Sequence, residues 1–143
     1  MVLELLLGVK TGIDLSRIYS TCELVAELTK VPIHRNKPVT GENEFLFGSG
    51  QVVWHTWKLA KTDRPHGNLP YMPELIGRKG YEVILGYGIG RTIIKDRLKK
   101  IGISATDEQM TEIAQRVKEA ASLRKWSVPD WEFEEIVKKV VGG

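Results

Sequence analysis

The sequence has little of what a self-contained catalytic or metal centre needs. It holds a single cysteine, Cys22, and three histidines among 143 residues. One cysteine cannot form an internal disulfide, which favours a reducing, cytoplasmic compartment. His34, His55 and His66 stand far apart in the sequence, without the paired spacing of zinc or iron sites. We therefore expect no metal site made by this chain alone, and no Ser-His-Asp signature is visible.

Long apolar runs and charge of one sign are also missing. The N-terminal apolar run, residues 2–7, is interrupted by Glu4 and is far shorter than the roughly 20 residues of a membrane-spanning helix. The 21 basic and 18 acidic residues interleave, and the net charge of +3 does not demand a nucleic acid. We expect a soluble protein with no membrane partner, for which nucleic acid is not the favoured ligand.

Apolar residues recur at helical spacing in much of the chain, which predicts a mostly α fold. The segments with this pattern are 15–29, 49–61, 92–101, 106–125 and 130–140. Residues 81–85, after Gly80, form a short strand candidate. The sequence therefore predicts helical subdomains with a short β element.

The ends and apolar faces of these helices are predicted from particular residues. Asp14 is expected to cap the first helix, and Thr106 with Gln109 forms a capping box for the fourth. Ser127 and Asp130 are expected to cap the last helix. The stripe expected to be buried in the first helix is Leu15, Ile18, Tyr19, Cys22, Val25 and Leu28. The stripe expected in the last helix is Trp131, Ile136, Val137 and Val140.

The least generic stretch is 38–50, Pro-Val-Thr-Gly-Glu-Asn-Glu-Phe-Leu-Phe-Gly-Ser-Gly. Pro38 fixes its own φ, and the glycines of the stretch allow backbone angles that other residues resist. Glu42 and Asn43 bring a carboxylate and an amide into this segment. We interpret the stretch as a shaped loop that leads into a helix and directs polar groups at a ligand or partner.

A second glycine-rich stretch, 86–91, lies between the strand candidate and a helix start. Backbone amides and a helix N-terminus can together bind a phosphate. The lysine and serine of a P-loop are missing and no βαβ unit surrounds the stretch, so a tight turn that packs the helix is the alternative. Four basic residues of the following helix are expected on its solvated side: Lys95, Arg97, Lys99 and Lys100.

Three stretches together resemble one family, the 2-isopropylmalate, homocitrate and Re-type citrate synthases, which are Claisen-condensing acyltransferases. Residues 38–50 resemble the segment that follows the barrel in these enzymes. Residues 73–78, Pro-Glu-Leu-Ile-Gly-Arg, and 85–91 followed by 98–102, resemble the next two signatures. The resemblance covers nearly the whole chain.

The resemblance implies that the chain is an accessory region without a TIM barrel. The barrel, with its divalent metal, would precede Met1. Residues 1–37 would be the end of a barrel-following helix and a linker helix, 38–79 a lid-like subdomain, and 80–143 a C-terminal helical subdomain. The missing leucine-binding regulatory domain favours the homocitrate or Re-citrate side. The expected partners are a barrel chain or domain in a homo- or hetero-oligomer, acetyl-CoA and a 2-oxo acid.

The resemblance also implies site residues. The family contributes a histidine and a tyrosine near the acyl-CoA, and we expect His55 and Tyr71 in these catalytic roles. The family's own histidines are replaced by Phe47 and Val52. We expect His55, about one helical turn away, to substitute for the catalytic histidine; the alternative is a packing or surface residue, as a lone helix histidine more often is. The residues expected to bind substrate are Glu42, Asn43, Ser49 and Arg91.

Three functions stay open at this point. The first is an accessory part of a condensing acyltransferase, inactive on its own. The second is a non-catalytic helical interaction module, which the residues Phe47 and Val52 favour. The third is a binder of phosphorylated ligands or nucleic acid through residues 86–91.

Overall fold

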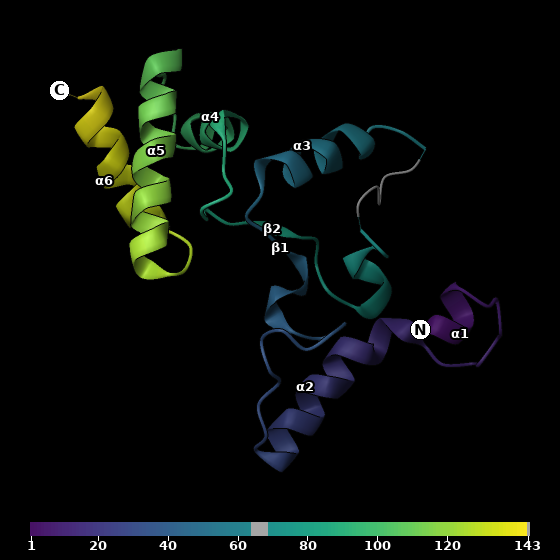
Figure 1. Cartoon of the computed structure of the whole chain (residues 1–143). Coiled ribbons are helices and arrows are strands. Elements are labelled where there is room, and N and C mark those ends of the chain that lie inside the picture. The colour runs from purple at the N-terminus through teal and green to yellow at the C-terminus, as the bar shows by residue number, and fades with distance from the viewer. Residues whose placement is uncertain (64–68, 143) are drawn as a thin grey trace. The chain divides into compact units, whose positions relative to one another are not determined.

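The computed structural model describes residues 1–63 and 69–142. Its helices are α1 (Val2–Leu5), α2 (Ile18–Thr29), α3 (Gly50–Leu59), α4 (Arg91–Lys100), α5 (Asp107–Arg124) and α6 (Asp130–Val141), as Figure 1 shows. Its 3-10 helices are η1 (Leu15–Arg17), η2 (Glu42–Phe45) and η3 (Pro73–Ile76). Two short strands, β1 (Leu46–Phe47) and β2 (Glu82–Val83), form the sheet.

The mostly α class with a short β element is thereby confirmed. The described residues contain no barrel of strands. No helix within them is both long and apolar enough to cross a membrane.

The chain forms two compact units. The first unit comprises residues 1–46 and 69–81, and the second comprises 47–68 and 82–143. Each unit is described by itself. The three-part division into 1–37, 38–79 and 80–143 remains a prediction.

In the first unit, the helix expected over 15–29 begins with a 3-10 turn. The Ser16 amide donates to Asp14 Oδ1 at 3.0 Å, so the predicted cap is confirmed, and η1 precedes α2. The predicted burial of the apolar stripe is wrong, because none of the described residues of α2 is buried. Val25 is 53% exposed and Leu28 is 73% exposed. Helical spacing identifies the apolar face of α2. The start of that face, at Ile18, Tyr19 and Cys22, is half-buried, and only its end is exposed.

The first unit is closed by a tight contact between η1 and η3. Gly77 ends η3 with φ 82°, in the left-handed region that favours glycine. A Cβ on Gly77 would fall onto the carbonyl oxygen of Ser16 in η1. The two 3-10 helices therefore approach each other at a point where no side chain fits.

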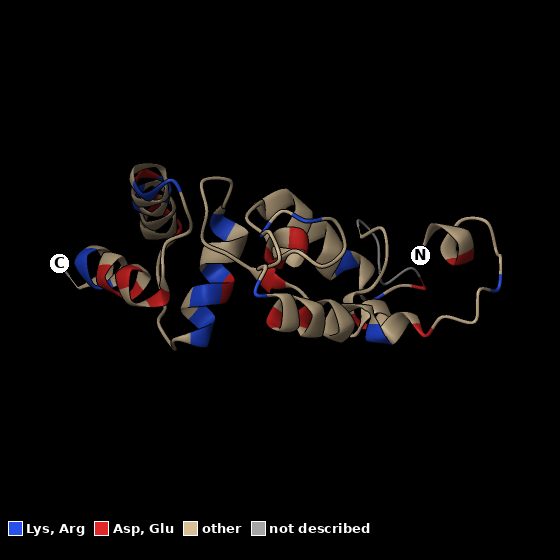
Figure 2. Cartoon of the chain, turned by 90° about the horizontal axis from the view of Figure 1, so that it is seen from below, with Lys and Arg blue, Asp and Glu red and all other residues tan. Residues whose placement is uncertain are grey.

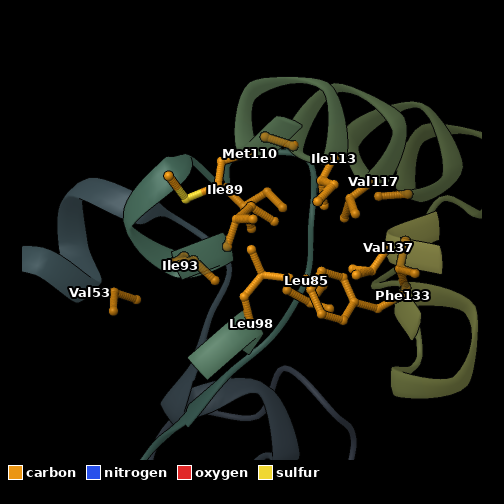
Figure 3. Packing of buried hydrophobic residues seen from close by; sticks show 14 residues of the cluster. Val53, Leu85, Ile89, Ile93, Leu98, Met110, Ile113, Val117, Phe133 and Val137 are labelled. Carbon is orange, nitrogen blue, oxygen red and sulfur yellow. The ribbon is translucent and has the colours of Figure 1, made fainter. Parts of the chain in front are cut away.

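The second unit contains a hydrophobic core built from all its helices (Figure 3). α5 packs against α4 and α6, and α4 also packs against α3. Leu85, just after β2, is 1% exposed, and its carbonyl accepts a bond from the Val128 amide at 2.9 Å. The buried members of the core are Val53, Leu85, Ile89, Ile93, Ile94, Leu98, Met110, Ile113, Ala114, Val117, Ala121, Val128, Phe133 and Val137.

The ends of α5 and α6 test the capping predictions. The capping box at Thr106 and Gln109 is confirmed, with both reciprocal bonds present. The cap predicted for α6 is wrong, because Pro129 occupies the N-cap position and Asp130 is the first helical residue. Proline at this position loses nothing, since the first amides of a helix have no partner within it.

The apolar face predicted for α6 is partly wrong. Trp131 is 59% exposed, whereas Phe133, which the prediction omitted, is 2% exposed. Phe133 shares a face with Val137 at helical spacing, and Trp131 points about 200° away from Phe133 at 100° per residue. The hydrophobicity of Trp131 was misleading, because its angular position places it outside the core.

Arg97 links α4 to β2 and α6 of the second unit through a hydrogen bond and an ion pair. Its Nη2 donates to the Val83 carbonyl at 2.6 Å and its Nη1 lies 3.0 Å from Asp130 Oδ1. The prediction that Arg97 lies on a solvated basic face is therefore wrong. Figure 2 shows basic residues gathered on α4, but Lys100 is also paired, with Asp96 at 2.9 Å.

Candidate functional site

In the first unit, η2 carries two of the predicted substrate-binding residues. Glu42 is exposed and forms an ion pair with Arg35, with 2.8 Å between Oε2 and Nε. The Asn43 amide donates through Nδ2 to Asn36 Oδ1 at 2.6 Å. Both side chains therefore hold the preceding loop against η2, and a ligand would have to compete with these contacts.

The loop before η2 is tightly wound. The Asn43 backbone amide donates to the Arg35 carbonyl at 3.0 Å, and the Gly41 amide donates to the Lys37 carbonyl at 2.8 Å. A Cβ on Gly41 would lie 2.5 Å from that Lys37 carbonyl oxygen. Two buried oxygens, Thr40 Oγ1 and Asn43 Oδ1, have no hydrogen-bond partner among the described residues. Gly41 is required in this motif because the backbone of Arg35 and Lys37 lies too close for a side chain at position 41.

Tyr71, predicted to be catalytic, lies against η2. Its hydroxyl donates to Glu44 Oε1 at 3.0 Å. Its ring meets Phe45 edge to face, with 5.7 Å between centroids and 89° between planes. Burial, reinforced by the hydrogen bond to Glu44, raises the pKa of Tyr71 to about 12. Tyr71 is therefore a neutral hydroxyl at physiological pH.

Arg78 holds this arrangement from the other side. Its guanidinium carbon lies 5.0 Å from the ring centroid of Tyr19 and 5.3 Å from that of Phe45. Its Nη1 donates to the Gly41 carbonyl at 2.8 Å. Neither Glu44 nor Arg78 was predicted as a site residue, although they lie within the motifs at 38–50 and 73–78. Their position in those motifs was the one feature of the sequence that could have identified them as site residues.

In the second unit, Ser49 and His55 lie at the start and middle of α3. Ser49 occupies the N-cap position, and its side chain makes no capping bond to the described residues. His55 is half-buried, and its ring centroid lies 5.0 Å from that of Trp54. It faces a shallow hollow of about 460 Å³, which is lined by Gly50, Gln51, Trp54, His55, Gly88, Ile89, Gly90 and Thr92.

Arg91 lies at the first position of α4 and is exposed. Its Nη1 is 4.0 Å from Asp107 Oδ2, a loose pair across to α5. It lines a hollow of about 740 Å³ whose wall also includes Glu108, Glu112 and Lys118. Three carboxylates around this guanidinium weaken its attraction for an anion.

The glycine-rich turn at 86–91 brings two backbone segments together. The Gly50 amide donates to the Gly88 carbonyl at 3.0 Å. A Cβ on Gly88 would lie 2.8 Å from the Gly48 carbonyl oxygen, and one on Gly50 would lie 3.2 Å from the Gly90 nitrogen. These contacts favour the interpretation of residues 86–91 as a tight packing turn. They do not favour the interpretation as a phosphate-binding loop.

A Gly88→Ala substitution should destabilise the second unit by about 1–3 kcal/mol, because the added methyl overpacks a backbone contact. Gly86→Ala is the matched control, since its Cβ would meet only ordinary contacts at 3.9 Å or more. Urea unfolding followed by tryptophan fluorescence measures both. Equal stability of the two variants would show that the close approach at Gly88 is not required.

Phe47 and Val52, where the resemblance implies histidines, both lie in the second unit. Phe47 is partly buried against the hydrophobic core, and its carbonyl accepts a bond from the Ile84 amide at 3.0 Å. Val52 is half-buried on α3, and its carbonyl accepts a bond from Thr56 Oγ1 at 2.9 Å. Neither side chain can donate or accept a proton.

The six predicted site residues form two groups. Glu42, Asn43 and Tyr71 gather at η2 in the first unit. Ser49, His55 and Arg91 lie around α3 and the glycine-rich turn in the second. His66 lies outside the described residues. Within the described ranges, no three His, Cys, Asp or Glu side chains are placed to hold a metal ion.

Comparison with known proteins identifies the chain's relatives. Residues 39–125 match the family described as "Homocitrate synthase post-HMGL domain-like". The chain belongs to this family. The match includes both η2 and the glycine-rich turn.

Similar proteins extend over nearly the whole chain. It is 36% identical over 141 residues to a putative (R)-citramalate synthase of Archaeoglobus fulgidus, covering 99% of this chain and 27% of that protein. It is 34% identical over 140 residues to the (R)-citramalate synthase of Methanocaldococcus jannaschii, covering 98% and 27%. It is 35% identical over 146 residues to the 2-isopropylmalate synthase of that organism, covering 99% and 27%. The chain thus spans about a quarter of the length of these curated relatives.

Proposed function

We propose that this chain is the accessory portion of an acyltransferase that condenses acetyl-CoA with a 2-oxo acid. A TIM-barrel chain or domain would supply the rest of the active site. The observation that carries the proposal is the family match over residues 39–125, together with relatives that bear synthase names and are several times longer.

Exposed apolar side chains in the first unit support docking onto such a partner. They are concentrated near the N-terminus and on α2: Val2, Leu3, Leu5, Leu6, Leu7, Val9, Ile13, Leu24, Val25, Leu28 and Val31. Soluble monomers rarely expose large contiguous apolar patches, and such patches are typical of interaction sites. We assign this surface to a barrel partner in a homo- or hetero-oligomer.

The roles of the predicted residues follow from their chemistry. In the first unit, Tyr71 would contact the acyl-CoA, and Glu42 and Asn43 would bind substrate. In the second unit, His55 would contact the acyl-CoA, and Ser49 and Arg91 would bind substrate. The described residues do not fit a divalent metal, so we assign the metal to the barrel. When bound there, it would polarise the ketone of the oxo acid while a base accepts a proton from the acetyl methyl group.

The substrate is proposed only as a class, a 2-oxo acid. The relatives are named for citramalate and 2-isopropylmalate, and the family description names homocitrate. We therefore compare pyruvate, 2-oxoisovalerate and 2-oxoglutarate, and we add oxaloacetate because the sequence also resembles Re-type citrate synthases.

A chimaera tests the proposal. The matching segment of the Methanocaldococcus jannaschii (R)-citramalate synthase is replaced by this chain, and release of CoA thiol is measured with each 2-oxo acid. We expect thiol release from the chimaera and none from this chain alone, because the metal-bearing part is required. A deletion variant that lacks the segment is the control.

Two results would contradict the proposal. One is thiol release by this chain without a barrel. The other is a folded chimaera that is no more active than the deletion variant.

The second candidate function is a non-catalytic docking module, which the residues Phe47 and Val52 favour. It predicts that Phe47→His and Val52→His leave turnover of the chimaera unchanged.

A further inference from the structure

The Tyr71 hydroxyl uses its proton in a hydrogen bond to Glu44. A phenol has one proton to donate, and an ionised carboxylate can only accept. The bond from Tyr71 Oη to Glu44 Oε1, at 3.0 Å, therefore uses the single donor of the hydroxyl. Toward any other group, Tyr71 offers only the lone pairs of its oxygen.

The packing around Tyr71 keeps this orientation. Phe45, the residue after Glu44 in η2, packs edge to face on the Tyr71 ring. Arg78 covers Phe45 and is bonded to the Gly41 carbonyl just before η2. The carboxylate and the aromatic contact thus come from adjacent residues of one short helix, and the ring cannot turn away without disturbing both.

The Tyr71 hydroxyl does not ionise at physiological pH, so its role as the donor to Glu44 is unchanged. Burial and the Glu44 hydrogen bond raise the pKa of Tyr71 to about 12, against a smaller opposing effect of Arg78. The hydroxyl therefore keeps its proton, and that proton remains committed to Glu44.

We propose that Glu44 is a positioning residue that makes Tyr71 a hydrogen-bond acceptor, directed at the amide N–H groups of the acyl-CoA and not at the 2-oxo acid. The inference rests on the proposed function. The pantetheine arm of CoA carries amide donors. An ionised 2-oxo acid presents its oxo and carboxylate oxygens, which only accept, so Tyr71 paired with Glu44 would repel them. The Glu44–Tyr71 pair thereby selects the acyl donor.

The first test uses the chain itself. Tyrosines labelled at Cζ are titrated by NMR, and Tyr71→Phe assigns the Tyr71 signal. Glu44→Gln should lower the pKa of Tyr71 by about one unit, because a charged acceptor is lost. Glu42→Gln is the matched control, since Glu42 in the same η2 pairs with Arg35 and should leave Tyr71 unchanged. An unchanged Tyr71 titration in Glu44→Gln would overturn the positioning role.

The second test measures ligand affinity in the chimaera by calorimetry. Tyr71→Phe and Glu44→Gln should each weaken acetyl-CoA binding about fivefold, the cost of one hydrogen bond, and leave 2-oxo acid affinity unchanged. Glu44→Asp should restore part of the loss. Weakened binding of the 2-oxo acid alone, or unchanged acetyl-CoA binding, would overturn the inference. An inactive chimaera that still shows the selective loss would count against the proposed function only.

Discussion

A Gly77→Ala variant is expected to lose the folded first unit while the second unit stays folded. The residue has φ 82°, and its Cβ would fall onto the Ser16 carbonyl oxygen, a backbone atom that cannot move aside. Left-handed strain and overpacking together should cost about 3 kcal/mol or more. Arg78 is the next residue, so its bond to the Gly41 carbonyl near η2 should be lost as well.

Hydrogen exchange is the measurement for this variant. All four tryptophans, Trp54, Trp57, Trp126 and Trp131, belong to the second unit, so fluorescence should not change. The amides of Leu75 and Arg78, which bond to Met72 and Pro73, should lose their protection.

Gly80→Ala separates the two causes of the Gly77→Ala effect. Gly80 also has a positive φ, 57°, but its Cβ would meet no described atom within 4 Å. It should therefore cost only the left-handed strain, about 1 kcal/mol. If both variants lost the same stability, the contact between η1 and η3 would not be what closes the first unit.

Local features of the chain were predictable from the sequence. The capping box of α5 joins Thr106 and Gln109, which are three residues apart. The Asp14 cap is likewise a bond to a residue two positions away. Such contacts are encoded within one helical turn, so the sequence specifies them without knowledge of the fold.

Contacts between distant segments were not predictable in this way. Tyr71 meets Glu44 across 27 residues, and Arg97 meets Asp130 across 33. Periodicity also identifies an apolar face without its partner, which is why the stripe of α2 was expected to be buried and is not. The family resemblance identified the two motifs that form the η2 site. It did not indicate which carboxylate of Glu42 and Glu44 contacts Tyr71.

A Phe133→Ala variant should destabilise the second unit by about 3–5 kcal/mol, the range for truncating a buried aromatic. Phe133 is 2% exposed in the core that α5 and α6 share. Because cavities in such cores close only in part, its removal leaves a void in the cluster that also contains Leu85 and Val137. Urea unfolding followed by far-ultraviolet circular dichroism, which reports helix content, measures the loss without relying on tryptophan.

Trp131→Ala is the matched control, because it removes an aromatic two residues earlier in the same helix. Trp131 is 59% exposed, and its ring centroid lies 5.7 Å from the guanidinium carbon of Arg124. An exposed contact of this kind contributes only about 0.5–1 kcal/mol. A larger loss from Trp131→Ala than from Phe133→Ala would mean that α6 buries the predicted face that includes Trp131, not the face that includes Phe133. α6 would then have to be rotated about its own axis, so that a different face packs against α5.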